Sequence, residues 1–294
     1  MLSYRRIGVT VKSNLDHRDE AVQSILGLLR KAGAEVLLDA ERCKDLSSAK
    51  GAPLFSREEN LDLLVVIGGD GTIFRAVREL EDFSIPILGI NKGGIGFLSE
   101  INTDEADKVI PRLLRDEGMI DERSVLKIEA VRAGKIFREG LVLNEAVISQ
   151  GSIARLLNVK TRINDEELTT FRSDGLIIAT PTGSTAYSLA AGGPIVHPSL
   201  RAMILTPINS HSLNQKPIVI PGDYVVTAEV QTKENKFGDI EVSLTLDGQT
   251  YVSLRRNDVV RALTAKETVK FLRRKQDTFF ATLREKLKWG ESLA

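Results

Sequence analysis

The segment Gly68-Gly-Asp-Gly-Thr72 places an acid inside a glycine-rich turn. It follows the nearly continuous apolar run Leu61 to Ile67, which is typical of a strand buried on both faces of a parallel sheet. From Thr72 onward the apolar positions follow helical spacing, so the turn joins a strand to a helix. Glycines let backbone N–H groups approach an anion closely, and a helix N-terminus carries partial positive charge. We therefore predict a phosphate-binding turn made by Gly68, Gly69, Gly71 and Thr72.

Asp70 is the residue of this turn that could do chemistry. A carboxylate repels phosphate unless it binds a metal ion or accepts a proton from an attacking hydroxyl, and both roles belong to phosphoryl transfer. The alternative is that Asp70 only starts a turn or caps the helix. The segment is not a P-loop, which needs Gly-Lys-Ser/Thr, and Phe74 stands where the dinucleotide fingerprint requires its third glycine.

Two other clusters combine polar residues with apolar strands. The segment 172–188 contains Asp174 and continues from an apolar run into a turn rich in threonine and serine. Such a density of hydroxyls suits recognition of ribose, phosphate and base edges, although an ordinary solvated Pro-Gly turn is the alternative. The pair Asn144-Glu145 interrupts the apolar run Leu141 to Ile148. Because side chains alternate along a strand, one of the pair must point inward, where it needs a ligand or a buried hydrogen bond.

Strand and helix patterns alternate over the first hundred residues, which indicates βαβ units and a parallel sheet with ligands beyond its carboxyl ends. Past Gly118 the patterns are those of strands, and the last twenty residues become helical again. We therefore expect an α/β plus all-β protein. Residues 1–118 form an N-terminal α/β Rossmann-like domain that binds nucleotide or phosphate, and 119–271 form a C-terminal β-sandwich-like domain. The helix within 272–294 returns to the first domain.

The composition excludes several classes of protein. With 40 basic and 40 acidic side chains, the chain lacks the excess positive charge of a general binder of nucleic acid or anionic membranes. The single cysteine, Cys43, excludes an intramolecular disulfide, and the three histidines lack zinc-ligand spacing. We find no N-terminal signal segment and no run of about 18 apolar residues. We expect a cytoplasmic protein that binds neither nucleic acid nor a membrane.

Four elements of the sequence together resemble the NAD kinase family, in the family's order and over most of the chain. They are the Gly-Gly-Asp-Gly-Thr turn, the Asn144-Glu145 pair, Asp174-Gly175, and the segment Thr180 to Ser188 with Gly192-Gly-Pro194. The resemblance implies transfer of the γ-phosphate of ATP to the 2′-hydroxyl of the adenosine ribose of NAD, giving NADP. It leaves polyphosphate open as a second donor. It also implies Mg²⁺ or another divalent metal, held mainly by phosphates, and a homo-oligomer, either a dimer or a tetramer.

The same resemblance implies roles for individual residues. Asp70 would be the general base, and an arginine at Arg172 would favour NAD over NADH. Phe97 is a candidate stacking surface for adenine, with core packing as the alternative. The residues implied in NAD binding are Asp70, Gly71, Arg75, Asn144, Glu145, Arg155, Arg172, Asp174, Thr185, Ala186, Tyr187, Ser188, Leu189, Ala190, Asn209 and Gln249.

Two other classes share part of this pattern. A lipid kinase of the diacylglycerol or sphingosine type would share the motif around Asp70, but it should also carry an apolar acceptor pocket or a membrane-facing patch, of which the sequence gives no sign. A non-catalytic nucleotide-binding regulator would tolerate the loss of Asp70. Replacing this one residue therefore distinguishes an enzyme from a regulator.

Overall fold

The computed structural model describes residues 3–13, 18–56, 60–93, 96–151, 156–231, 242–275 and 279–289. The chain divides into two compact units, the first made of the residues up to Glu122 and those from Val269 onward, the second of Arg123–Thr268. Strands β7 (Gly118–Arg132) and β18 (Val259–Arg274) carry the chain out of the first unit and back into it.

A parallel sheet forms the centre of the first unit. Its strands, in spatial order, are β3 (Leu54–Phe55), β2 (Glu35–Asp39), β1 (Arg6–Val11), β4 (Leu63–Ile67), β5 (Ile87–Asn91) and β6 (Ile101–Asn102). All of these neighbours pair in parallel. The end of β18 joins the same sheet, because Phe271 pairs in parallel with Ile87. The predicted α/β unit is confirmed.

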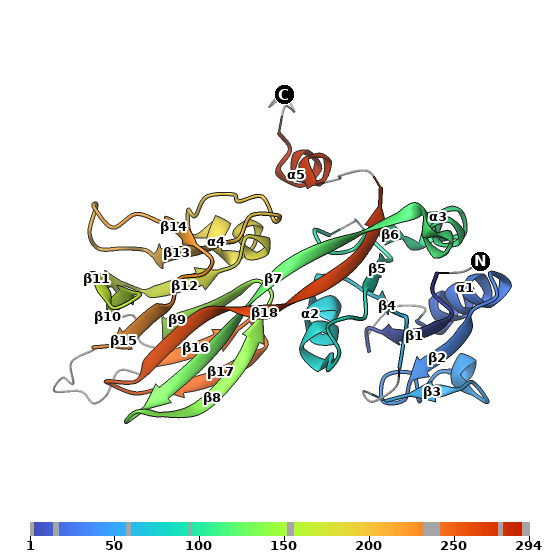
Figure 1. Ribbon diagram of the computed structural model, residues 1–294, viewed down its shortest axis with the longest axis horizontal. Coiled ribbons are helices and arrows are strands. Elements are labelled where there is room, and N and C mark those ends of the chain that lie inside the picture. The colour runs from blue at the N-terminus through green and yellow to red at the C-terminus, as the bar shows by residue number, and fades with distance from the viewer. Residues whose placement is uncertain are drawn as a thin grey trace. The chain divides into compact units, whose positions relative to one another are not determined.

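Helices cover both faces of this sheet (Figure 1). The covering helices are α1 (Arg18–Lys31), α2 (Asp70–Glu79) and α3 (Ala106–Arg112). The helix α5 (Phe279–Leu287) follows β18 and belongs to the same unit. The helices α1 and α3 contact each other and share one apolar core with Val65 and Ile67 of β4. Leu64 and Val66 alternate to the opposite face, where α2 contacts β4. Because both faces are buried, every residue of β4 is apolar, as its sequence indicated.

The second unit consists of two packed β-layers, as predicted for a sandwich-like domain. One layer has the order β11-β10-β15-β18 with β7 and β8 beside it, and the other has the order β14-β13-β12-β9-β16-β17. The remaining bounds are β8 (Lys135–Val142), β9 (Glu145–Gln150), β10 (Leu157–Ile163), β11 (Glu166–Ser173), β12 (Gly175–Ala179), β13 (Ala202–Ile208), β14 (Ile218–Pro221), β15 (Val226–Val230), β16 (Val242–Leu246) and β17 (Thr250–Leu254). Inward side chains of both layers, including Leu126, Val159, Ile178 and Leu244, form a single core.

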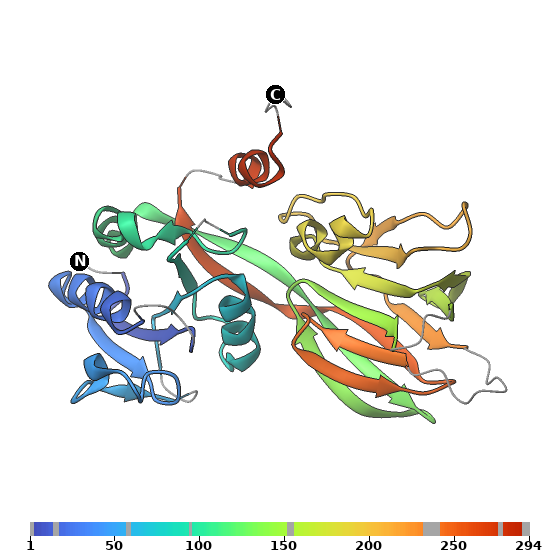
Figure 2. The ribbon, with the colours of Figure 1, turned by 180° about the vertical axis from the view of Figure 1, so that it is seen from behind.

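The segment that follows β12 covers the outer face of the second layer. Ile177 and Ala179 point to this face and pack with Val196, whereas Leu176 and Ile178 point to the core. The covering segment contains the 3₁₀ turn Thr182–Thr185 and the short helix α4 (Tyr187–Ala190), which contacts β12 (Figure 2). Among the described residues, no helix has the length and apolar character needed to cross a bilayer.

Candidate active site

Asp70 lies where the buried strand β4 ends and α2 begins, so the predicted strand-to-helix turn is present. The N-cap of α2 is Gly69, in an extended conformation, and the N–H of Thr72 donates to the Gly69 carbonyl over 2.8 Å. Asp70 is therefore the first helical residue and not the cap, and its carboxyl group is directed elsewhere.

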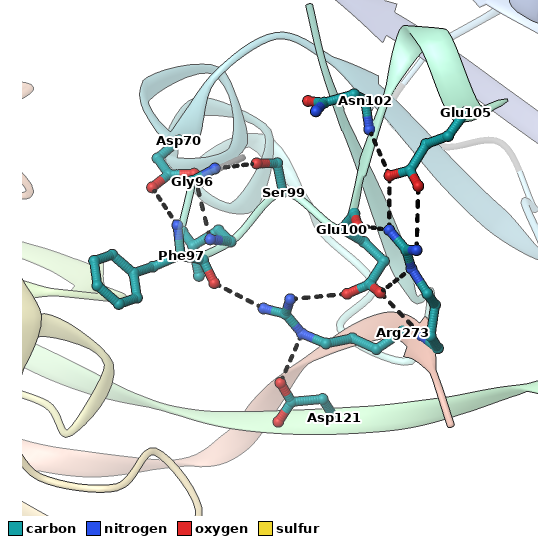
Figure 3. A network of polar contacts seen from close by, with 11 residues as sticks. Asp70, Gly96, Phe97, Ser99, Glu100, Asn102, Glu105, Asp121 and Arg273 are labelled. Carbon is teal, nitrogen blue, oxygen red and sulfur yellow. Dashed lines mark hydrogen bonds and ion pairs between the residues drawn. The ribbon is translucent and has the colours of Figure 1, made fainter. Parts of the chain in front are cut away.

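The Asp70 carboxylate is held by backbone amides of the loop that follows the neighbouring strand, β5. The N–H of Phe97 donates to Oδ2 over 3.2 Å, and the N–H of Leu98 donates to Oδ1 over 3.3 Å (Figure 3). The ring of Phe97 points away from the carboxylate, so Phe97 serves Asp70 through its main chain. Parallel strands end at the same edge of a sheet, which explains why residues 27 and 28 positions apart meet here.

Gly96 allows this loop to approach the carboxylate. A Cβ at position 96 would lie 2.2 Å from Oδ1 and 2.6 Å from Cγ of Asp70, closer than nonbonded atoms can come. The N–H of Gly96 donates to Oγ of Ser99 over 2.7 Å, which closes the loop on itself. The loop 96–99 is thus shaped around a single carboxyl group.

Arg75, on the same helix as Asp70, lies in a different environment. Its Nη2 donates to the carbonyl of Val11 over 3.3 Å, and it lines a cavity of about 400 Å³ together with Asp39 and Glu79. Burial lowers the pKa of its guanidinium, and the nearby charge of Arg42 lowers it further. Arg75 therefore contacts β1 and the cavity wall, not the loop that holds Asp70.

In the second unit, the apolar run around Asn144-Glu145 is not the single strand that its pattern predicts. The strand β8 ends at Val142 and β9 begins at Glu145, so Asn144 lies in a break between them. Both members of the pair are buried, with exposed fractions of 9% for Asn144 and 7% for Glu145. Strand alternation allowed only one of them to point inward, whereas the break in the backbone lets both do so.

Asp247 holds this break and was not found by sequence reasoning. Its Oδ2 accepts from the N–H of Leu143 over 2.8 Å, and its Oδ1 accepts from the N–H groups of Asn144 and Glu145 over 2.8 and 3.0 Å. Asp247 belongs to the turn between β16 and β17 and has a φ of +47°. The available signal was an Asp-Gly turn between two alternating apolar runs, two residues before the predicted Gln249.

Glu145 is a strongly perturbed acid of this unit. Burial, and next the negative charge of Asp247, raises the pKa of its carboxyl group to about 8. Its Oε2 is buried and has no hydrogen-bond partner within the described residues. Buried polar atoms are nearly always paired in native proteins, so this oxygen can take a hydrogen bond from water or from a bound molecule.

The threonine-rich segment lies directly against the Asn144 break. The N–H of Thr180 donates to the Asn144 carbonyl over 2.8 Å, and Oγ1 of Thr180 donates to the Leu143 carbonyl over 2.6 Å. A Cβ at Gly183 would lie 2.3 Å from the Asn144 carbonyl oxygen, so only glycine permits this approach. The pair and the segment, predicted separately, form one cluster.

The residues of the segment divide into a buried set and a set that keeps some exposure. The hydroxyl groups of Thr180, Ser184 and Ser188 are fully buried and bonded within the protein, Ser188 to Oγ1 of Thr206 over 2.9 Å. They build the loop, and their density in the sequence reflects that role. The predicted residues of the segment that keep partial or full exposure are Thr185, Ala186, Tyr187, Leu189 and Ala190.

Both halves of the chain match models of one family: residues 15–118 match the ATP-NAD kinase N-terminal domain, and residues 143–274 match the ATP-NAD kinase C-terminal domain. A protein named NAD kinase from Geobacter sulfurreducens is 38% identical over 288 residues, which cover 98% of this chain and 99% of that one. One of the same name from Geotalea daltonii is 38% identical over 92% of this chain and 93% of its own length.

The chain belongs to the NAD kinase family.

Two solved structures have the same fold as this chain. An NAD kinase from Archaeoglobus fulgidus in complex with ATP has a TM-score of 0.74 and 25% identity, with 96% of this chain and 98% of that chain covered. A yeast NADH kinase complexed with NADH has a TM-score of 0.89 at 24% identity, with 99% of this chain and 89% of that chain covered. The latter likeness concerns the fold alone.

The remaining residues that the NAD kinase resemblance singled out lie mostly in the second unit. Asp174 and Asn209 are brought together, since Nδ2 of Asn209 donates to Oδ2 of Asp174 over 3.0 Å. Arg172 is exposed on β11, and Gln249 is exposed in the turn that carries Asp247. Arg155 lies outside the described residues.

A divalent metal, implied by the family resemblance, would find few protein ligands. Within the ranges that the structure describes, no group of three or more His, Cys, Asp or Glu side chains could hold a metal ion. Asp70 offers one carboxylate beside the N–H groups of a helix N-terminus, which attract phosphate. These residues fit a cation that arrives on the phosphates of a nucleotide, not one bound by protein ligands alone.

Proposed function

We propose that this protein transfers the γ-phosphate of ATP to the 2′-hydroxyl of the adenosine ribose of NAD, giving NADP and ADP. The observation that carries the proposal is the Asp70 carboxylate, fixed by two backbone N–H groups at the start of a helix that follows a parallel strand. Membership of the NAD kinase family supports the identity of the two substrates, as do the names of its relatives.

In this proposal Asp70 is the general base. The 2′-hydroxyl oxygen attacks the γ-phosphorus, the bond from that phosphorus to the β-γ bridging oxygen breaks, and the hydroxyl proton passes to Asp70. The N–H groups of Phe97 and Leu98 fix the carboxylate in one orientation, so that no reorganisation is needed during the reaction. Gly68, Gly69, Gly71 and Thr72 would supply the donors to phosphate. A bound divalent cation supplies positive charge against the phosphate oxygens.

The buried carboxyl of Glu145 supports a dinucleotide site in the second unit. Its unpartnered Oε2 can accept a hydrogen bond from a ribose hydroxyl or pair with an amide of the ligand. Asn144 lies beside it, and the bonded pair Asp174 and Asn209 offers further polar atoms. The complete set of NAD contacts named from the family resemblance remains part of this proposal, as do a cytoplasmic location and homo-oligomeric assembly.

One set of incubations tests the proposal. The purified chain is mixed with NAD or NADH as acceptor, ATP or polyphosphate as donor, and Mg²⁺ or a chelator, and the 2′-phosphorylated product is measured. We expect NADP from NAD, ATP and Mg²⁺, and a large loss of product with the chelator. Absence of product from every pair would contradict the proposal, and phosphorylation of diacylglycerol vesicles instead would favour the lipid-kinase alternative.

A further inference from the structure

The loop that holds Asp70 is itself held by a buried arginine. Nη2 of Arg273, at the end of β18, donates to the Phe97 carbonyl over 2.9 Å. The backbone N–H of Phe97 donates in turn to the Asp70 carboxylate (Figure 3). Both contacts are made by the main chain of Phe97, one by its carbonyl and one by its N–H. A displacement of the Phe97 carbonyl therefore also displaces an N–H that fixes the Asp70 carboxylate. Arg273 thus acts on Asp70 through a single intervening residue.

The guanidinium of Arg273 cannot move freely, because its other nitrogens are bonded to two acids. Nη1 donates to Oε2 of Glu100 over 3.1 Å, and Nε donates to Oδ2 of Asp121 over 2.9 Å. The side chains of Arg273 and Glu100 are only 10% and 3% exposed, so little solvent screens this pair. A planar guanidinium with three acceptors at fixed directions has one orientation, which an ammonium group cannot reproduce.

The same cluster joins the two strands by which the chain leaves and re-enters the first unit. Asp121 lies on β7 immediately before the boundary at Glu122, and Arg273 lies on β18 shortly after the boundary at Val269. The cluster couples the geometry of the Asp70 loop to both connections of the chain.

We propose that Arg273 is a positioning residue for phosphoryl transfer, because it fixes the Phe97 carbonyl and through it the N–H groups that orient the Asp70 carboxylate. The inference rests on the proposed role of Asp70 as general base. It assigns Arg273 no contact with either substrate.

Arg273→Lys tests the proposal, with Arg274→Lys as its matched control. Arg274 is in the same network, but among the described residues its hydrogen bonds go to Glu100 and Glu105 and not to the loop 96–98. We expect Arg273→Lys to lower kcat about 10- to 100-fold, because misplacing a catalytic group by about 1 Å can cost about 100-fold. The KM for NAD should stay within about twofold. Arg274→Lys should keep parental kcat even if its denaturation midpoint falls equally.

A double-mutant cycle with Asp70→Asn distinguishes positioning from a general structural defect. If Arg273 acts through Asp70, adding Arg273→Lys to Asp70→Asn should lower the residual kcat less than about twofold. A fully additive loss, an equal loss in Arg274→Lys, or parental kcat in Arg273→Lys would each overturn the proposal. If Asp70→Asn alone keeps parental kcat, the proposed function fails instead, which separates the two failures.

If Arg273→Lys does not fold, Asp121→Asn takes its place. This variant keeps the guanidinium, its bond to Glu100 and the size of the side chain at position 121, and removes one charge from its surroundings. We expect a kcat about two- to fivefold lower, with the same lack of additivity toward Asp70→Asn. Parental kcat in a folded Asp121→Asn would count against the proposal.

Discussion

The loop around Asp70 and the turn around Asn144 share one hydrogen-bonding arrangement, but the carboxylate has a different role in each. In both, a carboxylate accepts hydrogen bonds from successive backbone N–H groups, those of Phe97 and Leu98 in the first case and of Leu143 to Glu145 in the second. In the first unit the held carboxylate is the proposed base. In the second unit the carboxylate that accepts these bonds, Asp247, has a supporting role, and the group proposed to meet the ligand is the buried Glu145.

Asp70 and Glu145 differ in the hydrogen bonds that their carboxyl groups make within the protein. Asp70 has donors on both carboxylate oxygens. Glu145 has a buried oxygen without a partner in the described residues, and the charge of Asp247 adds to the effect of burial on its pKa. Preorganisation of a reactive group and readiness for a ligand are different physical states, and the two turns are examples of each. Substitutions should therefore affect turnover in one turn and binding in the other.

The largest expected effect is that of Asp70→Asn. Loss of a general base typically lowers turnover by about 10²- to 10⁴-fold, and asparagine keeps the size of the side chain and one acceptor for the loop amides. NAD affinity, measured by titration of the free protein, should change less than about twofold. A variant that phosphorylates NAD at the parental rate would show that Asp70 is not the base.

The two close-packed glycines give the next contrast. Alanine at Gly96 meets the Asp70 carboxylate, a side chain that can rotate away, so the fold should survive while kcat falls about 100-fold. Alanine at Gly183 meets the Asn144 backbone, which cannot rotate away, so we expect about 1–3 kcal/mol of lost unfolding free energy and a higher KM for NAD. Gly93→Ala is the control, since a Cβ there meets nothing within 4 Å. If both glycine variants changed only stability, the contrast between the turns would be wrong.

How far the sequence predicted these turns depends on whether their bonds are local in the chain. The buried β4, the start of α2 and the sandwich-like second unit followed from apolar periodicity and glycine positions, which are local signals. The break at Asn144 did not, because the acid that holds it, Asp247, is 103 residues away in the chain. Nor did the hydrogen bond from Arg273 to Phe97, which lie 176 residues apart in the chain. Such bonds depend on strand order and register, which a single sequence does not display.

Asp247→Ala should produce the third largest effect. It removes the acceptor of three backbone N–H groups, and each buried donor left unsatisfied costs about 1–3 kcal/mol, less where water can replace the carboxylate. We expect a loss of about 3 kcal/mol in urea unfolding and a KM for NAD about tenfold higher, with kcat at saturation close to parental. Asp247→Asn keeps one carbonyl acceptor, so its unfolding free energy and its KM for NAD should lie between those of the parent and of Asp247→Ala. A drop in kcat without a change in KM would contradict the supporting role.

The smallest effect is a pH dependence of stability that Glu145 introduces. Its pKa is raised in the folded protein from 4.5 to about 8, so between these values the folded state retains a proton that the unfolded state has released. Stability should therefore fall as pH rises through this window, by at most about 1.4 kcal/mol per pH unit, and level off above pH 8. Between about pH 6 and pH 7.5 this amounts to roughly 2 kcal/mol at most.

Glu145→Gln removes the titrating group but keeps the shape of the side chain. In urea unfolding, the stability of this variant should therefore rise relative to that of the parent as pH rises. Glu166→Gln, which removes the same charge from an exposed site, should not reproduce that trend. A constant difference between Glu145→Gln and the parent across this range would mean that Glu145 is ionised in the folded protein. The turn around Asn144 would then stabilise Glu145 in its ionised form, as the loop around Asp70 holds a carboxylate. The contrast between the two turns would reduce to their positions in the fold.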